Sequence, residues 1–134
     1  MRPLRQEAGP LLRGGWRVGL GSDVAGGQTL DLFTVMATAV QVSKLRWRYI
    51  DQSEKPLTMT EALYMATVGG GDFWADFGEN VGLFEDGYVF DALVLDDAAL
   101  KNMRTFTPTE RLERYAYLGR GALTAKFAQG KKIV

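Results

Sequence analysis

The sequence of 134 residues contains neither histidine nor cysteine. Without cysteine there can be no disulfide and no thiolate metal site. A catalytic zinc ion is usually held by three protein ligands, of which imidazole is the commonest and thiolate its main substitute. We therefore expect no zinc or other cofactor to be bound by this chain on its own.

An excess of charge of either sign is also lacking, because 16 Lys and Arg balance 16 Asp and Glu. This balance predicts neither a nucleic-acid partner nor an anionic membrane surface. No apolar run approaches the roughly 18 residues of a membrane span, and the first residues do not have the pattern of a signal peptide. By elimination we expect a cytoplasmic protein without a membrane partner.

The periodicity of the apolar residues, which with tyrosine and tryptophan make up 46% of the chain, predicts one α+β folding unit. Spacings of three and four predict helices over residues 4–15, 30–49, 58–68 and 107–119. Alternating or continuous apolar runs predict strands over residues 16–21, 81–84, 88–95, 123–128 and 131–134. The glycines at 69–71 are expected to end the third helix, and Gln129-Gly130 is expected to join the last two strands as a hairpin.

The expected helix starts carry capping residues. Thr58 with Glu61 and Thr107 with Glu110 each fit a capping box, in which a threonine and a glutamate three residues later bond each other's backbone amides. Pro108 then occupies the first helical position, where its missing N–H costs nothing. Thr29 is available to cap the helix over residues 30–49.

Asp23 is the candidate site residue, because it follows the predicted strand 16–21 and precedes a glycine-rich turn. A nucleotide-binding loop is excluded, since Val24 stands where the dinucleotide fingerprint needs its third glycine. A carboxylate at the carboxyl end of a barrel strand is a common catalytic or metal-ligating group. The simpler alternative is that Asp23 only caps the turn, and the residues alone favour that alternative.

Two other groups of residues could suggest binding but have a plainer explanation. The aromatic residues between 73 and 88 could stack on nucleic-acid bases, yet no basic groove accompanies them, so we expect core packing. Those residues are Phe73, Trp74, Phe77, Phe84 and Tyr88. Arg46 and Arg48 beside Trp47 are expected to form a solvated helix face.

The segment Gly-Leu-Gly-Ser-Asp-Val-Ala-Gly-Gly at residues 19–27 resembles the signature that closes the last barrel strand of guanine deaminases, in the zinc amidohydrolase superfamily. Further segments are similar to that family in the same order. Residues 42–45 and 63–70 resemble its next two helices, residues 81–87 and 90–95 its return into a small β-sandwich, residues 110–119 its late helix and residues 129–134 its final strand. Tyr88 departs from the family, which often has lysine there.

The resemblance implies a (β/α)₈ barrel with an appended β-sandwich. Residues 1–71 would be the end of the barrel, and residues 72–134 the C-terminal part of the sandwich region with its late helix. A whole barrel takes about 250 residues, so this chain would hold only the C-terminal portion of such an enzyme.

The resemblance also implies a role for Asp23, as a zinc ligand that takes part in proton transfer while guanine is hydrolysed to xanthine and ammonia. The histidines that complete the family's zinc site would precede Met1, so we expect the isolated chain to be inactive. We expect a homo-oligomer, or association with the missing N-terminal portion. The alternative function is a non-catalytic oligomeric module derived from an amidohydrolase.

Overall fold

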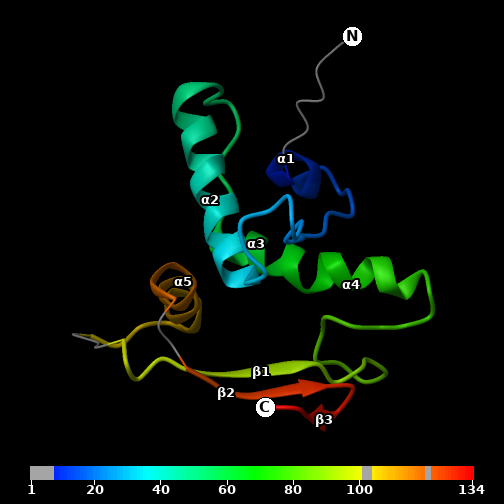
Figure 1. The fold of residues 1–134 in the computed structure, drawn as a ribbon. Coiled ribbons are helices and arrows are strands. Elements are labelled where there is room, and N and C mark those ends of the chain that lie inside the picture. The colour runs from blue at the N-terminus through cyan, green and yellow to red at the C-terminus, as the bar shows by residue number, and fades with distance from the viewer. Residues whose placement is uncertain (1–7, 101–103, 120–121) are drawn as a thin grey trace.

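The computed structural model describes residues 8–100, 104–119 and 122–134, and these form five helices and one three-stranded antiparallel sheet (Figure 1). The elements are α1 (Ala8–Arg13), α2 (Leu32–Tyr49), α3 (Met59–Ala66), α4 (Val68–Ala75), β1 (Ala92–Asp96), α5 (Pro108–Leu118), β2 (Ala122–Ala128) and β3 (Lys131–Lys132). The predicted α+β class is confirmed. Residues 4–7 of the first predicted helix lie outside the described residues. No helix in the described ranges is both long and apolar enough to cross a membrane.

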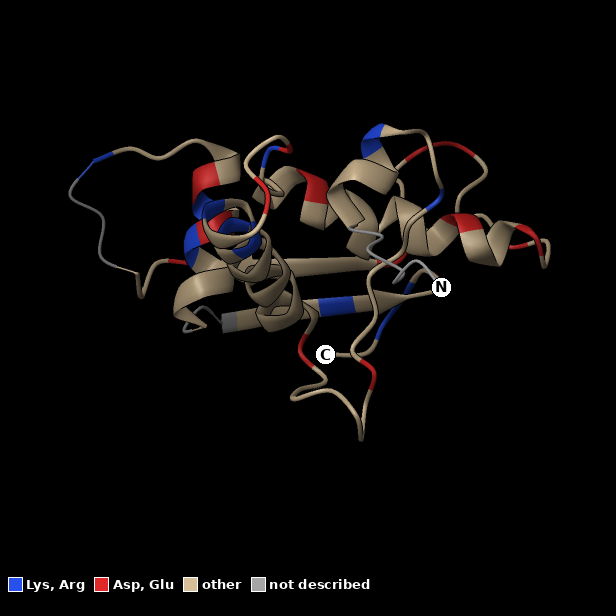
Figure 2. Cartoon of the chain, turned by 90° about the horizontal axis from the view of Figure 1, so that it is seen from above, with Lys and Arg blue, Asp and Glu red and all other residues tan. Residues whose placement is uncertain are grey.

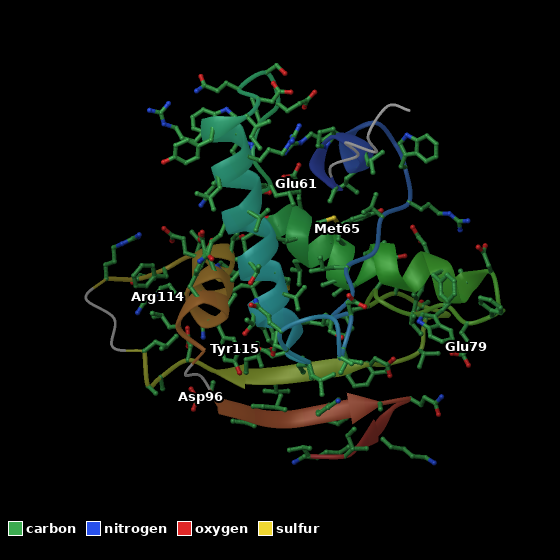
Figure 3. The ribbon with its side chains drawn as sticks, turned by 45° about the horizontal axis from the view of Figure 1, so that its top comes forward. Glu61, Met65, Glu79, Asp96, Arg114 and Tyr115 are labelled. Atoms are coloured by element: carbon green, nitrogen blue, oxygen red, sulfur yellow. The ribbon has the colours of Figure 1, made fainter. Side chains whose placement is uncertain are left out.

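The core lies where α2 crosses α3 and α5. Met36 and Val40 of α2 and Met65 of α3 are the largest fully buried side chains in the described part of the chain. Met65 projects from α3 toward the extended segment that precedes α2 (Figure 3). Each such side chain contributes about 1.5–3 kcal/mol through removal of apolar surface from water, so this crossing is the main source of stability.

Both predicted capping boxes are confirmed. The backbone amide of Thr58 donates to Glu61 Oε2 over 2.8 Å and that of Glu61 donates to Thr58 Oγ1 over 3.2 Å, and Thr107 and Glu110 repeat the arrangement. Glu61 also reaches toward α1 (Figure 3), where Arg13 donates to its carboxylate over 2.8 and 3.0 Å. This ion pair lowers the pKa of Glu61 and fixes α1 to the start of α3.

The predicted cap of α2 is wrong by two residues. Asp31 is the N-cap, and its carboxylate accepts from the amides of Phe33 and Thr34. Thr29 supports the cap instead, because its hydroxyl accepts from the amide of Asp31 over 3.0 Å. A carboxylate is favoured at this position since it also meets the positive end of the helix dipole.

The glycines at 69–71 do not end a helix, contrary to expectation, but form the first turn of α4. A Cβ atom at Gly69 would collide with the carbonyl oxygen of Val18, and one at Gly71 would collide with that of Val81. The turn therefore lies in direct backbone contact with two segments that are remote in sequence. Close approach, and not helix termination, is the reason for these glycines.

The predicted strands at 16–21 and 81–84 are wrong as well. Residues 16–21 have no regular secondary structure and join no ladder, and the amide of Leu20 donates instead to the carbonyl oxygen of Met65 over 2.9 Å. Within the described ranges, the sheet contains only β1, β2 and β3. An extended segment needs a neighbouring strand to become part of a sheet, and here its neighbours are helices.

The predicted hairpin is present in the sheet. β2 and β3 pair antiparallel, and Gln129 and Gly130 turn the chain with positive φ angles of 50° and 74°. β1 pairs with the other edge of β2 and is shorter than predicted, since residues 88–91 are outside it. Of the described strands, β1 and β3 are thus the two edges.

The aromatic residues between 73 and 88 do not pack in the core, so that prediction is wrong. Phe73, Trp74, Phe77 and Phe84 are exposed, and only Tyr88 is partly buried. The first three lie on or just after the C-terminal half of α4, which extends beyond α3 (Figure 1), and their rings contact one another. They form an exposed cluster because no described element covers this end of the helix.

We predict opposite effects from alanine at neighbouring glycines of α4. Gly69→Ala should lower the free energy of unfolding by about 1–3 kcal/mol, because its Cβ would strike the backbone of Val18. Gly70→Ala is the matched control, since its Cβ would lie 3.8 Å from the Met65 carbonyl oxygen, an ordinary van der Waals distance. The control should be neutral, or more stable by up to about 1 kcal/mol through helix propensity. Urea denaturation measures both, and equal effects would contradict the contact.

We also predict that the capping box of α5 weakens in acid. Hydrogen bonds from the backbone of Thr107, from Arg104 and from the Thr107 hydroxyl lower the pKa of Glu110 from 4.5 to about 2. A carboxyl whose pKa is lower in the folded state stabilises the fold above its unfolded pKa and loses that effect as the pH falls toward its folded pKa. Glu110→Gln should therefore lower the melting temperature at pH 6. The difference in melting temperature between the variant and the parent protein should shrink as the pH falls from 4.5 to 2. A difference that does not depend on pH would refute this role.

Candidate functional site

Asp23 lies in a tight turn between the extended segment 16–22 and α2. Its φ angle is 48° and that of Ala25 is 77°, both in the left-handed region. The main-chain carbonyl of Asp23 accepts from the amides of Gly26, over 2.9 Å, and of Gly27. The hydrogen bonds of the turn therefore use the main-chain carbonyl of Asp23. The side-chain carboxylate, which is exposed, takes no part in them.

The two glycines after Asp23 are fitted to this turn. A Cβ atom at Gly26 would lie 2.7 Å from Oδ2 of Asp23, so any side chain there would displace the carboxylate. A Cβ atom at Gly27 would collide with the carbonyl oxygen of Ser22. The Asp-Val-Ala-Gly-Gly sequence thus permits both the turn and the position of the carboxylate.

Contacts on both sides of the turn fix its position. Before it, Val18 and Leu20 pack against the core, and Arg17 binds the Asp76 carboxylate with both terminal nitrogens over 3.2 and 3.0 Å. After it, Gln28 donates to the hydroxyl of Thr38 on α2 over 3.0 Å. Sequence reasoning missed these anchors, and their spacing in the chain gave no signal for them.

The described residues do not form a metal site by themselves. They contain no group of three or more His, Cys, Asp or Glu side chains close enough to share an ion. Asp31, the next carboxylate along the chain, is occupied with capping α2. A zinc site needs about three protein ligands, so the donor set here does not fit zinc without further ligands.

A separate cavity of about 230 Å³ lies between α1, the C-terminal half of α2 and the loop that follows. Its walls are mainly apolar, and Arg46 lines it beside Trp47. The prediction of a solvated basic face is thus only partly correct, because Arg48 is exposed whereas Arg46 is half-buried. The cavity lies toward the opposite end of α2 from Asp23 and does not include that residue.

Charged residues of both signs are scattered over the described chain (Figure 2). The exposed aromatic cluster of α4 is flanked by Asp72, Asp76 and Glu79, which would repel phosphate groups.

The sequence matches the family described as "Amidohydrolase family" over residues 2–132. It is 29% identical over 128 residues to a guanine deaminase of Dictyostelium discoideum, covering 92% of this chain and 28% of that protein. It is 38% identical over 84 residues to guanine deaminase of Homo sapiens, covering 62% of this chain and 18% of that protein. The chain therefore spans less than a third of the length of these relatives.

Solved structures show the same relationship. A guanine deaminase from C. acetobutylicum, with guanine bound in its active site, superimposes with a TM-score of 0.82 at 42% sequence identity, covering 96% of this chain and 30% of that one. Guanine deaminase of E. coli superimposes with a TM-score of 0.74 at 21% identity, covering 93% and 29%, and shows a common fold. The resemblance to guanine deaminases is confirmed, and the chain belongs to the amidohydrolase family.

Proposed function

We propose that this chain is the C-terminal portion of a guanine deaminase-like enzyme, which hydrolyses guanine to xanthine and ammonia. The observation that carries the proposal is the likeness to the C. acetobutylicum enzyme, at 42% identity and a TM-score of 0.82, because that structure has guanine in its active site. The Asp-Val-Ala-Gly-Gly turn, which resembles the family's signature, supports it, since the carbonyl and glycine contacts of the turn depend on its sequence.

In this proposal residues 1–71 are the end of the (β/α)₈ barrel and residues 72–134 belong to the small β-sandwich region. Residues 16–22 would be the last barrel strand, with α2 as the helix that follows it. The position of Asp23 directly after this segment supports the assignment, because barrel enzymes place their catalytic groups at the carboxyl ends of their strands. The strand ladder would form only beside neighbouring barrel strands.

We propose Asp23 as the residue of this chain that contributes to catalysis and to zinc binding. Its exposed carboxylate and its fixed turn support the role, because a ligand must be accessible and held in one geometry. The other ligands must come from outside these 134 residues, which include no histidine. Guanine as substrate, purine catabolism and a cytoplasmic location remain part of the proposal.

The alternative of a non-catalytic oligomeric module has one observation in its favour. Large apolar side chains, among them Trp74 and Phe77, are exposed, and such clusters commonly mark an interaction surface. Both functions require assembly with other polypeptide. They differ in whether Asp23 has a chemical role, which the next two experiments address.

The first experiment concerns zinc. We predict that the dialysed chain binds zinc no more tightly than an exposed carboxylate does, because Asp23 has no imidazole partners. Isothermal titration with zinc should therefore give the same weak heat for the parent chain and for Asp23→Ala. Stoichiometric binding in the submicromolar range that is lost in Asp23→Ala would contradict this expectation.

The second experiment concerns activity. The isolated chain should release no ammonia from guanine above the buffer rate, whereas mixing it with the N-terminal portion of the C. acetobutylicum enzyme should restore turnover. Asp23→Asn should reduce the restored rate by about 10²–10⁴-fold, as expected when a proton-transfer group is lost. Asp31→Asn is the matched control, because asparagine also caps helices well, and it should leave the rate unchanged. Restored turnover that does not depend on Asp23 would exclude the proposed role.

A further inference from the structure

The segment between Asp23 and α2, residues 24–31, has little support from the core. All of its residues are exposed except the half-buried Thr29, and none of them belongs to the hydrophobic core cluster. Two of them are Gly26 and Gly27, and glycine leaves the backbone more conformational freedom than any other residue. The position of this segment therefore depends on its hydrogen bonds.

One hydrogen bond joins the segment to the body of α2. Nε2 of Gln28 donates to Oγ1 of Thr38 over 3.0 Å, and the Thr38 hydroxyl in turn donates to the carbonyl oxygen of Thr34 over 2.8 Å. The hydroxyl hydrogen thus points at Thr34, which leaves an oxygen lone pair for Gln28. Among the hydrogen bonds between described residues, no other side chain of residues 24–31 bonds beyond residue 34. Gln28 is therefore the side chain that fixes this segment along the helix.

The chain before Asp23 is held differently, by several contacts at once. Val18 and Leu20 pack against the core, and the amide of Leu20 donates to the carbonyl oxygen of Met65 over 2.9 Å. The loss of any one of these contacts leaves the others in place. Support is thus redundant before Asp23, whereas after it the link to the body of α2 is a single side-chain bond.

That bond can act on Asp23 through the two glycines that precede Gln28. The amides of Gly26 and Gly27 both donate to the main-chain carbonyl of Asp23, and the Asp23 carboxylate lies against Gly26. Since Gln28 follows Gly27 directly, holding its side chain on α2 restrains the amides that close the turn. The turn needs this support, because Asp23 has a φ of 48° and left-handed backbone is unfavourable for residues other than glycine.

We propose that Gln28 is a positioning residue, which holds the carboxylate of Asp23 in one geometry through its hydrogen bond to Thr38. The inference rests on the proposed deaminase function, because Gln28 would act through Asp23. A catalytic group misplaced by about 1 Å can lose about 10²-fold in rate. A turn that is open part of the time should therefore lower turnover in proportion to the fraction of molecules in which it is open.

The first test measures the turn in the isolated chain by hydrogen exchange. Gln28→Ala should raise the exchange rates of the Gly26 and Gly27 amides by about three- to tenfold, as expected for the loss of one hydrogen bond. Thr38→Val should do the same, whereas Thr38→Ser keeps the hydroxyl and should not. Gln41→Ala is the matched control, because it removes a glutamine from an exposed position on the same helix. Unchanged exchange in Gln28→Ala would overturn the inference.

The second test measures the turnover restored by the N-terminal portion of the C. acetobutylicum enzyme. Gln28→Ala should lower kcat by about three- to tenfold and leave KM for guanine unchanged, because the geometry of Asp23 changes and the binding of the purine does not. In a Thr38→Val background, Gln28→Ala should cause no further loss, since the bond is already absent. A higher KM at constant kcat, or losses that add, would contradict positioning through this bond.

The positioning role and the proposed function can fail separately. Restored turnover that is the same in Asp23→Asn would exclude the proposed function, and the positioning role with it. Faster exchange in Gln28→Ala together with an unchanged kcat would exclude the positioning role alone and leave the deaminase function standing.

Discussion

The backbone contact between the first turn of α4 and two distant segments is the constraint that organises this fold. Gly69 touches the carbonyl group of Val18, and Gly71 touches that of Val81. These contacts hold the extended segment that leads to Asp23 against the helices. They also set where the chain leaves α4 for the sheet. Since any Cβ atom would separate these backbones, a short run of glycine determines the positions of the candidate site and of the C-terminal region together.

Several elements whose determining interactions are local were predicted from the sequence, although the N-cap of α2 was misplaced by two residues. The capping boxes at Thr58 and Thr107 and the hairpin at Gln129-Gly130 each depend on residues within a few positions of one another. The segment 16–21 shows the limit of this reasoning. Its alternation is that of a strand, but strand formation depends on neighbours that are not beside it here. The same limit applies to residues 69–71. Their glycines are needed for backbone contacts with Val18 and Val81, which are distant in the sequence and are seen only in the folded chain.

Asp23 was singled out as a candidate from its place before a glycine-rich turn and from the resemblance of that turn to a known family, and its role stays a prediction. The surroundings of Asp23 were not predicted. The anchors from Arg17 to Asp76 and from Gln28 to Thr38 could not be identified, because ion pairs and side-chain hydrogen bonds between distant positions leave no periodic pattern. The expected core position of Phe73 failed for a related reason. The aromatic nature of a side chain indicates that it will be covered, but it does not indicate which polypeptide will cover it.

The exposed surfaces and the incomplete metal site have the same physical character. A carboxylate without imidazole partners binds a zinc ion only weakly, and the exposed aromatic cluster of α4 gains no hydrophobic stabilisation until another surface covers it. Both features can contribute binding free energy only when another polypeptide contacts them. The further ligands that the proposed zinc site at Asp23 needs are of a type that no copy of this sequence contains, since the chain has neither histidine nor cysteine. Only a different polypeptide could therefore complete that site.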